Sequence, residues 1–392
     1  ATWRNDASKQ PEWGVCNSNV SVTLTDTDTD NLLAASDTVT ITAFFTEAMT
    51  ATPRISISGL VTNVVMTKIS IGGNSSVVTQ LGSDIDGEAA NDQSGRSVSL
   101  SSDGLTVAIG AYFNDGTSSG NGNDNRGHVR IYNYNGSAWV QVGADIDGEA
   151  TGDYSGKQLS LSSNGRRVAI AGHENDGNGT NSGHVRIYDY NGSAWVQVGG
   201  DIDGEAANDY SGYSVSLSSD GSRVAIGAAY NDGASGNGND NRGHVRIYDY
   251  NGSAWVQVGA DIDGEAESDQ SGHSVSLSSD GSRVAIGARY NDGGGTDSGH
   301  VRVYDYNGSA WVQVGADING EAASDQSGES VSLSSDGSSV AIGAMNNDGN
   351  GSDSGHVRVY DYNGSAWVQV GGDIDGEAAN DYSGGAVSLS SD

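Results

Sequence analysis

Acidic side chains recur at regular intervals in this sequence, in a segment D-I-D/N-G-E-A that is followed by D-x-S-G. The first copy begins at Asp84 and the sixth at Asp373. Carboxylate oxygens at alternate positions around a glycine are the ligands that Ca²⁺ prefers. The sequence therefore indicates one candidate calcium site per copy. In the first four copies the candidate ligands are Asp84, Asp86, Glu88, Asp92, Asp145, Asp147, Glu149, Asp153, Asp201, Asp203, Glu205, Asp209, Asp261, Asp263, Glu265 and Asp269.

The same acidic segments also fit a role without an ion. D-x-D-G is a typical turn sequence, because Asp side chains accept hydrogen bonds from nearby backbone N–H groups. No copy has the full spacing of an EF-hand loop, and one copy replaces its second Asp by Asn319. Calcium binding and turn capping therefore both stay open.

Histidine and tryptophan also recur once per copy. The histidines are His128, His184, His244, His300 and His356, and the tryptophans are Trp139, Trp195, Trp255, Trp311 and Trp367. A catalytic or zinc-binding histidine would need a setting of its own, so five identical copies favour a packing role. The tryptophans are expected to fill the gaps between repeated units, and the alternative is a shelf on which sugars stack.

No catalytic motif stands out. The sequence has no G-x-S-x-G elbow, H-E-x-x-H pair or phosphate-binding loop, and no carboxylate pair outside the repeat. An active site is usually singular, whereas this sequence is nearly periodic. We therefore expect a protein that is not an enzyme.

Five Asn-Gly-Ser tripeptides are candidate N-glycosylation sites. They begin at Asn135, Asn191, Asn251, Asn307 and Asn363. Asn-Gly is also a strong signal for a tight hairpin, because both residues tolerate positive φ. The hairpin alone is sufficient to explain these five positions.

The charge balance narrows the class of partner. The 392 residues carry 51 Asp and Glu against 18 Lys and Arg, a formal net charge of −33. Such a surface repels nucleic acids and anionic membranes, since both depend on Lys and Arg to meet phosphate. No run of about 18 apolar residues is present, so insertion into a membrane is not expected. Cys16 is the only cysteine, which excludes a disulfide within the chain.

The spacing of these residues follows a repeat that predicts the fold. Copies lie 56 to 61 residues apart, and each contains four runs rich in Val, Ile, Tyr and Trp, separated by the turns S-x-D/N-G and N-G-S. Four short antiparallel strands per unit at this period predict a β-propeller. Differences in length fall between V-A-I-G-A and G-H-V, which places a variable loop on the same rim as the acidic segments.

The pattern D-Q-S-G-x-S-V-S-L-S-S-D-G-x-x-V-A-I-G-A resembles the FG-GAP repeat of integrin α-chain propellers, over roughly residues 80–392. The resemblance implies a β-propeller, often seven-bladed, in an extracellular adhesion or surface protein. That family's calcium loop, D-x-D-x-D-G, has no counterpart here, where only Ser-Ser-Asp-Gly is present. Its calcium site cannot be transferred to this chain.

The N-terminal part follows a different pattern. Residues 20–66 are Thr-rich with alternating apolar positions, and together with F-T-E-A-M-T they resemble bacterial Ig-like modules, at half the length of a full sandwich. We therefore expect an arm over residues 1–19, a partial Ig-like β-sandwich over 20–70 and propeller repeats over 71–392. Five repeats are complete and the flanking ones are partial, which predicts either a longer chain or completion of the array by a neighbour.

The all-β architecture, the charge and the resemblance together predict an extracellular structural or adhesive protein that self-associates, as a homo-oligomer or fibre, through its N-terminal β region. The alternative is a lectin-like propeller that binds cell-surface glycans in aromatic pockets between blades. Calcium is the only cofactor that the sequence indicates.

Overall fold

A computed structural model of the chain describes residues 80–116, 124–233 and 240–390, together with four strands that precede them. The chain divides into two compact units, residues 1–79 and 80–392. The preceding strands are β1 (Ser21–Thr25), β2 (Thr40–Phe44), β3 (Arg54–Ile57) and β4 (Val61–Val65). They pair antiparallel as β1 with β2 and β3 with β4. The predicted arm and most of the predicted Ig-like module lie outside the described residues.

The second unit consists of five copies of one antiparallel sheet, and its described residues contain no helix. The first sheet contains β5 (Ser97–Leu100), β6 (Thr106–Ala111), β7 (His128–Tyr134), β8 (Trp139–Gln141) and β9 (Ile146–Asp147). The second contains β10 (Gln158–Leu161), β11 (Arg167–Gly172), β12 (His184–Tyr190), β13 (Trp195–Gln197) and β14 (Ile202–Asp203). The third contains β15 (Ser214–Leu217), β16 (Arg223–Ala228), β17 (His244–Tyr250), β18 (Trp255–Gln257) and β19 (Ile262–Asp263). The fourth contains β20 (Ser271–Leu277), β21 (Arg283–Ala288), β22 (His300–Tyr306), β23 (Trp311–Gln313) and β24 (Ile318–Asn319). The fifth contains β25 (Ser330–Leu333), β26 (Ser339–Ala344), β27 (His356–Tyr362), β28 (Trp367–Gln369) and β29 (Ile374–Asp375).

Each sheet has the four predicted strands in chain order and one short strand that the sequence did not predict. In the first sheet the order is β5-β6-β7-β8, and β9 pairs with the beginning of β7. The acidic D-I-D/N-G-E-A segment, called the link below, contributes this fifth strand and then leads to the next sheet. The link therefore has a fixed register against the sheet that it leaves.

The predicted turns form because their side chains replace missing backbone partners. In the turn before β6, Asp103 Oδ1 accepts a hydrogen bond from Ser101 Oγ at 2.6 Å and another from Leu105 N at 2.9 Å. In the turn before β8, Asn135 Oδ1 accepts from the backbone N–H groups of Ser137 and Ala138. These local contacts close the hairpins.

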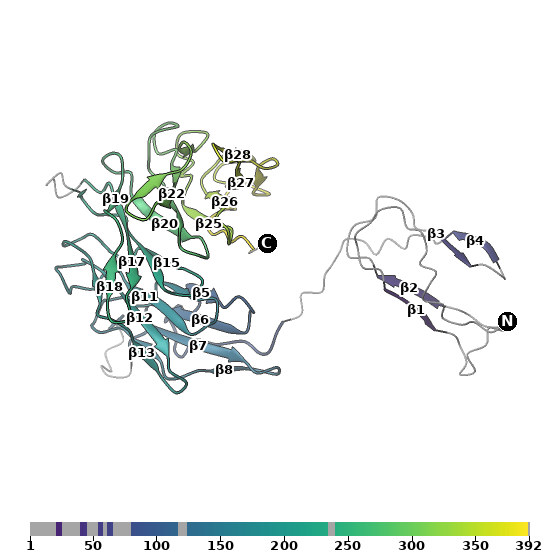
Figure 1. Cartoon of the computed structure of the whole chain (residues 1–392), viewed down its shortest axis with the longest axis horizontal. Helices are drawn as coiled ribbons and strands as arrows, with labels where there is room; N and C mark the ends of the chain where they lie inside the picture. Colours follow the sequence, from purple (N-terminus) through teal and green to yellow (C-terminus); the bar gives the residue numbers. More distant parts are fainter. Residues whose placement is uncertain are drawn as a thin grey trace. The chain divides into compact units, whose positions relative to one another are not determined.

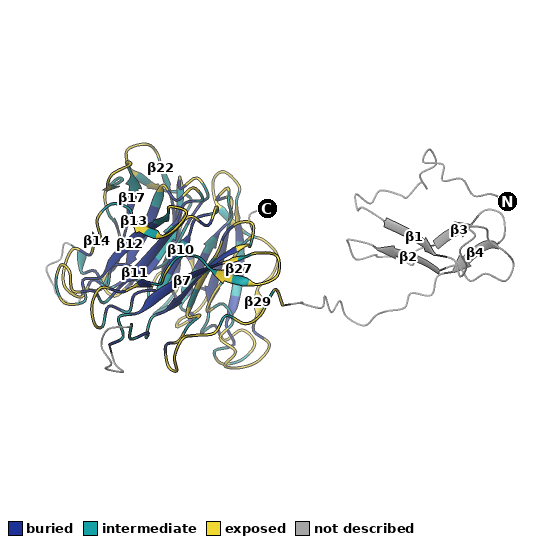
Figure 2. Cartoon of the chain, turned by 90° about the horizontal axis from the view of Figure 1, so that it is seen from below, coloured by how far each residue is buried: buried dark blue, intermediate teal, exposed yellow. Residues whose placement is uncertain are grey.

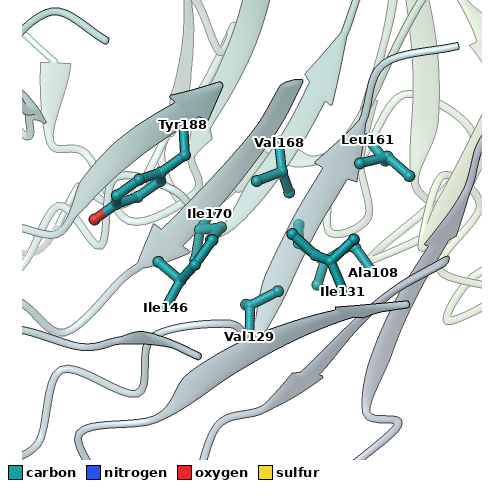
Figure 3. Packing of buried hydrophobic residues seen from close by; sticks show 9 residues of the cluster. Ala108, Val129, Ile131, Ile146, Leu161, Val168, Ile170 and Tyr188 are labelled. Carbon is teal, nitrogen blue, oxygen red and sulfur yellow. The ribbon is translucent and has the colours of Figure 1, made fainter. Parts of the chain in front are cut away.

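The core lies between successive sheets. Apolar side chains of β6 and β7 meet those of β10 and β11, as Figure 3 shows for Ile131 and Ile170, both almost fully buried. In Figure 2 the buried residues follow the strands and the exposed residues lie in the loops. The tryptophans complete this packing, because Trp195 Nε1 donates a hydrogen bond to Val142 O of the preceding sheet at 2.8 Å. Alternating positions along each strand thus face opposite neighbours, as expected for stacked sheets.

The innermost strands gather around a common axis. In Figure 1, β5, β15, β20 and β25 lie toward the centre of the array and β8, β13 and β18 toward its outside. A backbone ladder joins the turns at their ends, from Ser102 N to Ser163 O, from Ser163 N to Ser219 O and from Ser219 N to Ser279 O, at 2.8–2.9 Å. This radial arrangement is that of a β-propeller, which confirms the fold predicted from the repeat.

The variable loop and the acidic link lie on the same rim of the propeller, as predicted. Asn178, in the variable loop of the second sheet, donates hydrogen bonds from Nδ2 to Gly204 O and Glu205 O of the following link, at 2.8 and 3.0 Å. The tight turns lie at the other ends of the strands. Any site built from loops and links must therefore lie on this rim.

Candidate functional site

The five sheets are almost identical in sequence outside the variable loops, and one position that differs in every sheet lies near the axis. The residue that follows Ser-Gly, at the start of each innermost strand, is Arg96, Lys157, Tyr213, His273 or Glu329. Because the innermost strands surround the axis, these side chains come into contact. The ring centroids of Tyr213 and His273 are 4.9 Å apart, and His273 Nε2 lies 3.1 Å from Glu329 Oε2.

A cavity of about 570 Å³ opens beside these residues, between the second and third sheets. This volume lies within the usual range for sites that bind small ligands. We call this cavity the cleft. It is lined by Lys157, His173, Glu174, Ala207, Asn208, Tyr210, Tyr213, Tyr230, Asp232 and Asn241.

A lysine and a histidine form the polar wall of the cleft. Lys157 Nζ lies 2.8 Å from His173 Nε2, and Glu174 Oε1 lies 3.5 Å from the same nitrogen. Burial lowers the pKa of Lys157 and also the pKa of His173. Burial thus disfavours the charged form of both groups, and the two nitrogens lie within hydrogen-bond distance of each other. Perturbed pKa values in a cavity are typical of functional sites.

Three tyrosines form the aromatic part of the lining. The Tyr213 and Tyr230 rings meet edge to face at 5.6 Å, and Tyr210 lies 5.2 Å from Tyr230. Burial raises the pKa of Tyr213 to about 12, so its hydroxyl is a neutral hydrogen-bond donor. The cleft thus combines aromatic rings with hydroxyl, amine, amide and carboxylate groups.

A second polar group closes the far side of Tyr213. Arg289 Nη1 and His273 Nε2 each lie 3.1 Å from Glu329 Oε2, and Arg289 Nε donates to Gln270 Oε1. Burial alone would raise the pKa of Glu329, but the hydrogen bonds and positive charge of its two partners outweigh burial and lower it. These contacts fix the residues that support the cleft.

The four acidic residues predicted to bind calcium in each copy do not converge on one point. The fourth, exemplified by Asp209, is buried, and its Oδ2 accepts hydrogen bonds from Ala206 N at 2.9 Å and Asn231 Nδ2 at 3.1 Å. Asp92 Oδ2 likewise accepts from Ala89 N and Asn114 Nδ2. These carboxylates cap turns, which is the alternative that the sequence left open.

The glutamate of one link and the first aspartate of the next link meet a histidine instead. The ligand atoms of each group lie within 4.8 Å of one another, so these acidic groups are able to hold a metal. The five groups are Glu88–His128–Asp145, Glu149–His184–Asp201, Glu205–His244–Asp261, Glu265–His300–Asp317 and Glu321–His356–Asp373. The sequence assigned the histidines to packing only, because each group draws its members from two successive copies. Burial lowers the pKa of His184 to about 4, which leaves its imidazole neutral.

The candidate glycosylation sites lie in the exposed N-G-S hairpins. The Oδ1 atom of Asn191 accepts hydrogen bonds from Ser193 and Ala194, so the side-chain carbonyl is engaged in the turn. Glycosylation at these positions stays a prediction.

Sequence reasoning missed the cleft. The signal that identifies it is the set of positions at which one copy departs from the others, such as Lys157 against Tyr213. The sequence analysis considered the residues that recur in every copy. A single site on a repeated scaffold is instead formed by residues that differ between copies.

Comparison with known proteins supports the class of protein that this fold defines. Residues 319–360 match the FG-GAP repeat, which confirms the resemblance stated above. No curated protein matches the chain. The chain is thus a β-propeller, and residues 319–360 of it match the FG-GAP repeat.

Three solved structures are similar to this chain at low identity. They are the periplasmic gluconolactonase PpgL of Pseudomonas aeruginosa (15% identity, 70% of each chain covered, TM-score 0.45), a putative 6-phosphogluconolactonase from Bacteroides uniformis (10%, 72% of this chain and 85% of that one, 0.43) and a putative TolB from Agrobacterium tumefaciens (12%, 72% and 84%, 0.40). At such identities the likeness concerns the fold alone.

The sequence led us to expect a protein that is not an enzyme, and this exclusion was wrong. A gluconolactonase and a putative 6-phosphogluconolactonase are among the solved structures that resemble it, so the exclusion does not stand. The physical reason is that a propeller places unlike side chains from several sheets around one axis. A periodic sequence can therefore still build a singular site.

Proposed function

We propose that the chain is a glycan-binding β-propeller whose cleft holds a neutral, polyhydroxylated ligand. The observation that carries this proposal is the gathering of the non-repeated Lys157, His173 and Tyr213, together with Tyr230, around one cavity of about 570 Å³. Residues that break a repeat at a single point are expected to serve a function that the scaffold does not need.

The chemistry of the lining favours a sugar. Aromatic faces cover the C–H faces of a sugar ring, and amine, amide and carboxylate groups bind its hydroxyls with defined orientation. Lys157, Asn208 and Asp232 offer such groups beside the tyrosines. A net charge of −33 opposes the approach of anionic ligands. The ligand is therefore expected to be neutral.

The tryptophan pockets predicted from the sequence are a weaker place for the ligand. Trp367 Nε1 already donates to Val314 O at 2.9 Å, and Tyr362 lies against the indole with centroids 5.2 Å apart. The cavity beside Trp367 is about 210 Å³, below the usual range for ligand sites. These contacts support a packing role for the tryptophans.

Binding measurements on matched variants test the proposal. A glycan array identifies the ligand, and isothermal titration calorimetry then compares Tyr230→Ala with Tyr290→Ala. Tyr290 occupies the same position one sheet further and does not line the cleft. We expect Tyr230→Ala to weaken binding at least about tenfold, equivalent to about 1.4 kcal/mol, and Tyr290→Ala to leave it unchanged. Equal affinities of the two variants, or no binding to any neutral glycan, would contradict the proposal.

Self-association outside the cell, which the sequence predicts through residues 20–70, stays a second proposal. It is supported by strands β1 to β4, which form only two-stranded sheets among the described residues of that unit. Unpaired strand edges are where further strands add. Electron microscopy of the full chain tests it, since filaments or discrete oligomers are expected and a uniform monomer would contradict it.

Calcium binding at the links also stays a proposal. Ca²⁺ takes six to eight oxygen ligands, and the links offer carboxylates at the rim. Calorimetric titration with CaCl₂ tests it directly, and an absence of heat at millimolar calcium would contradict it.

A further inference from the structure

A histidine, a glutamate and an aspartate meet at the same place in every sheet, and none of them lines the cleft. In the second sheet, His184 is the first residue of β12, Glu149 lies in the link that enters the sheet, and Asp201 lies in the link that leaves it. The same three elements supply the group in each of the other four sheets.

The distances within the group are too long for hydrogen bonds. His184 Nδ1 lies 3.9 Å from Glu149 Oε2 and 3.9 Å from Asp201 Oδ2. A hydrogen bond requires a separation below about 3.2 Å. Two ligands bound to one zinc ion at about 2.1 Å each lie about 3.4 Å apart in a tetrahedral site, and at most about 4.2 Å. The two distances of 3.9 Å lie between these values, so both carboxylates are within reach of an ion bound at Nδ1.

The imidazole lacks the partners that a buried polar group needs. His184 is 1% exposed, and neither of its ring nitrogens has a hydrogen-bond partner. The same holds for both nitrogens of His300 and for Nδ1 of His356. Buried polar groups are nearly always paired, so unpaired nitrogens that recur in several copies require an explanation. An ion at Nδ1 supplies one for that nitrogen.

The carboxylates are held with one oxygen directed toward the histidine. Gln197 Nε2 donates a hydrogen bond of 2.6 Å to Asp201 Oδ1, which leaves Oδ2 toward His184. Arg186 Nη1 lies 3.6 Å from Glu149 Oε1, which leaves Oε2 toward the same ring. The glutamine contact has the same length in all five sheets. Partners of this kind orient metal ligands in known sites.

We propose that each Glu–His–Asp group binds one divalent transition-metal ion, with Zn²⁺ as the representative probe. The ligands are the histidine Nδ1 and one oxygen from each carboxylate, and water completes the coordination. Imidazole is a ligand of zinc and its neighbours in the periodic table, whereas Ca²⁺ selects oxygen. Each ion would join the link that enters a sheet to the link that leaves it.

The number of zinc ions bound by variants of two neighbouring aspartates tests this proposal. The full chain is stripped of metal with a chelator and dialysed against ZnCl₂, and bound zinc is measured by mass spectrometry. Asp201→Asn removes a ligand, whereas Asp203→Asn makes the same charge change two residues further, outside the group. We expect about five zinc ions in the wild type and in Asp203→Asn, and about four in Asp201→Asn.

Two further arms keep the outcome decisive. Glu149→Gln should also lose about one zinc ion, and an excess of CaCl₂ should displace none. Equal zinc content in Asp201→Asn and Asp203→Asn would overturn the proposal, as would complete displacement by calcium or less than one zinc per wild-type chain. Circular dichroism verifies that each variant is folded.

Discussion

At the scale of single residues, Glu329 shows how unlike side chains are fixed around the axis. Its carboxylate lies within ion-pair distance of His273 and Arg289, and the pKa of Glu329 is lowered from its ordinary value. Because the folded-state pKa lies below the unfolded one, the stabilisation is fully present above about pH 4.5 and is lost as the pH falls through the folded-state pKa.

If this pairing stabilises the fold, the free energy of unfolding should depend less on pH in a variant that lacks the Glu329 charge. Glu329→Gln should lose less stability than the wild type when the pH falls below about 4.5, because the glutamine cannot be protonated. Urea unfolding at a series of pH values measures the difference, with exposed Glu267→Gln as the control. An acid limb in Glu329→Gln as steep as that of the wild type would contradict this assignment.

Residue types alone identified part of each site. The link carboxylates were recognised as candidate ligands, and Glu149 and Asp201 do meet at a group that is able to hold a metal. Their partner His184 was assigned to packing, because nothing in the spacing tells which links approach one another. The cleft residues were missed because Lys157 and Tyr213 are close only once the innermost strands surround the axis.

At the scale of elements, a backbone contact between Gly183 and Ser211 joins neighbouring sheets. Gly183, just before β12, forms a parallel bridge with Ser211, the residue before Gly212 at the entry to the next sheet. Gly183 has φ of +72°, and a Cβ there would overlap the backbone of Ser211. Gly192, in the N-G-S hairpin, has φ of +99° with open space around it. Both glycines thus have a positive φ, but only Gly183 is in close contact with another segment.

The contrast gives a prediction about packing between sheets. Gly192→Ala should cost about 1 kcal/mol of unfolding free energy, from the positive φ alone. Gly183→Ala should cost at least about 3 kcal/mol, because the backbone of the next sheet must also move. Equilibrium urea denaturation measures both. Equal losses in the two variants would show that the contact between Gly183 and Ser211 contributes little.

The four main strands of each sheet could be predicted because their signals are local. Alternation in β7 and the Asn135-Gly136 turn identify a hairpin without reference to the rest of the chain. The short strand β9 could not be predicted in this way. Its two residues pair directly with the first residues of β7, beside β8, and that contact depends on where the folded sheet places the link.

At the scale of the whole molecule, the repeated sheets stack on one another around the axis. Each sheet covers the next, as the 7% exposure of Leu159 shows, whereas the equivalent Val98 of the first sheet is 61% exposed. The propeller class was predictable from periodicity alone. The site on it was not, because a strict repeat gives every sheet the same surface and only the departures from it create a single cleft. The described residues contain no helix that is long and apolar enough to span a membrane.

The central claim is that the ligand occupies the cleft, and a crystal structure of the chain soaked with the glycan that it binds tests this most directly. We predict density for the sugar against Tyr213 and Tyr230, with a hydroxyl within hydrogen-bond distance of Lys157 Nζ. Density for the sugar against Trp255 or its equivalents between the sheets, with the cleft empty, would contradict the claim.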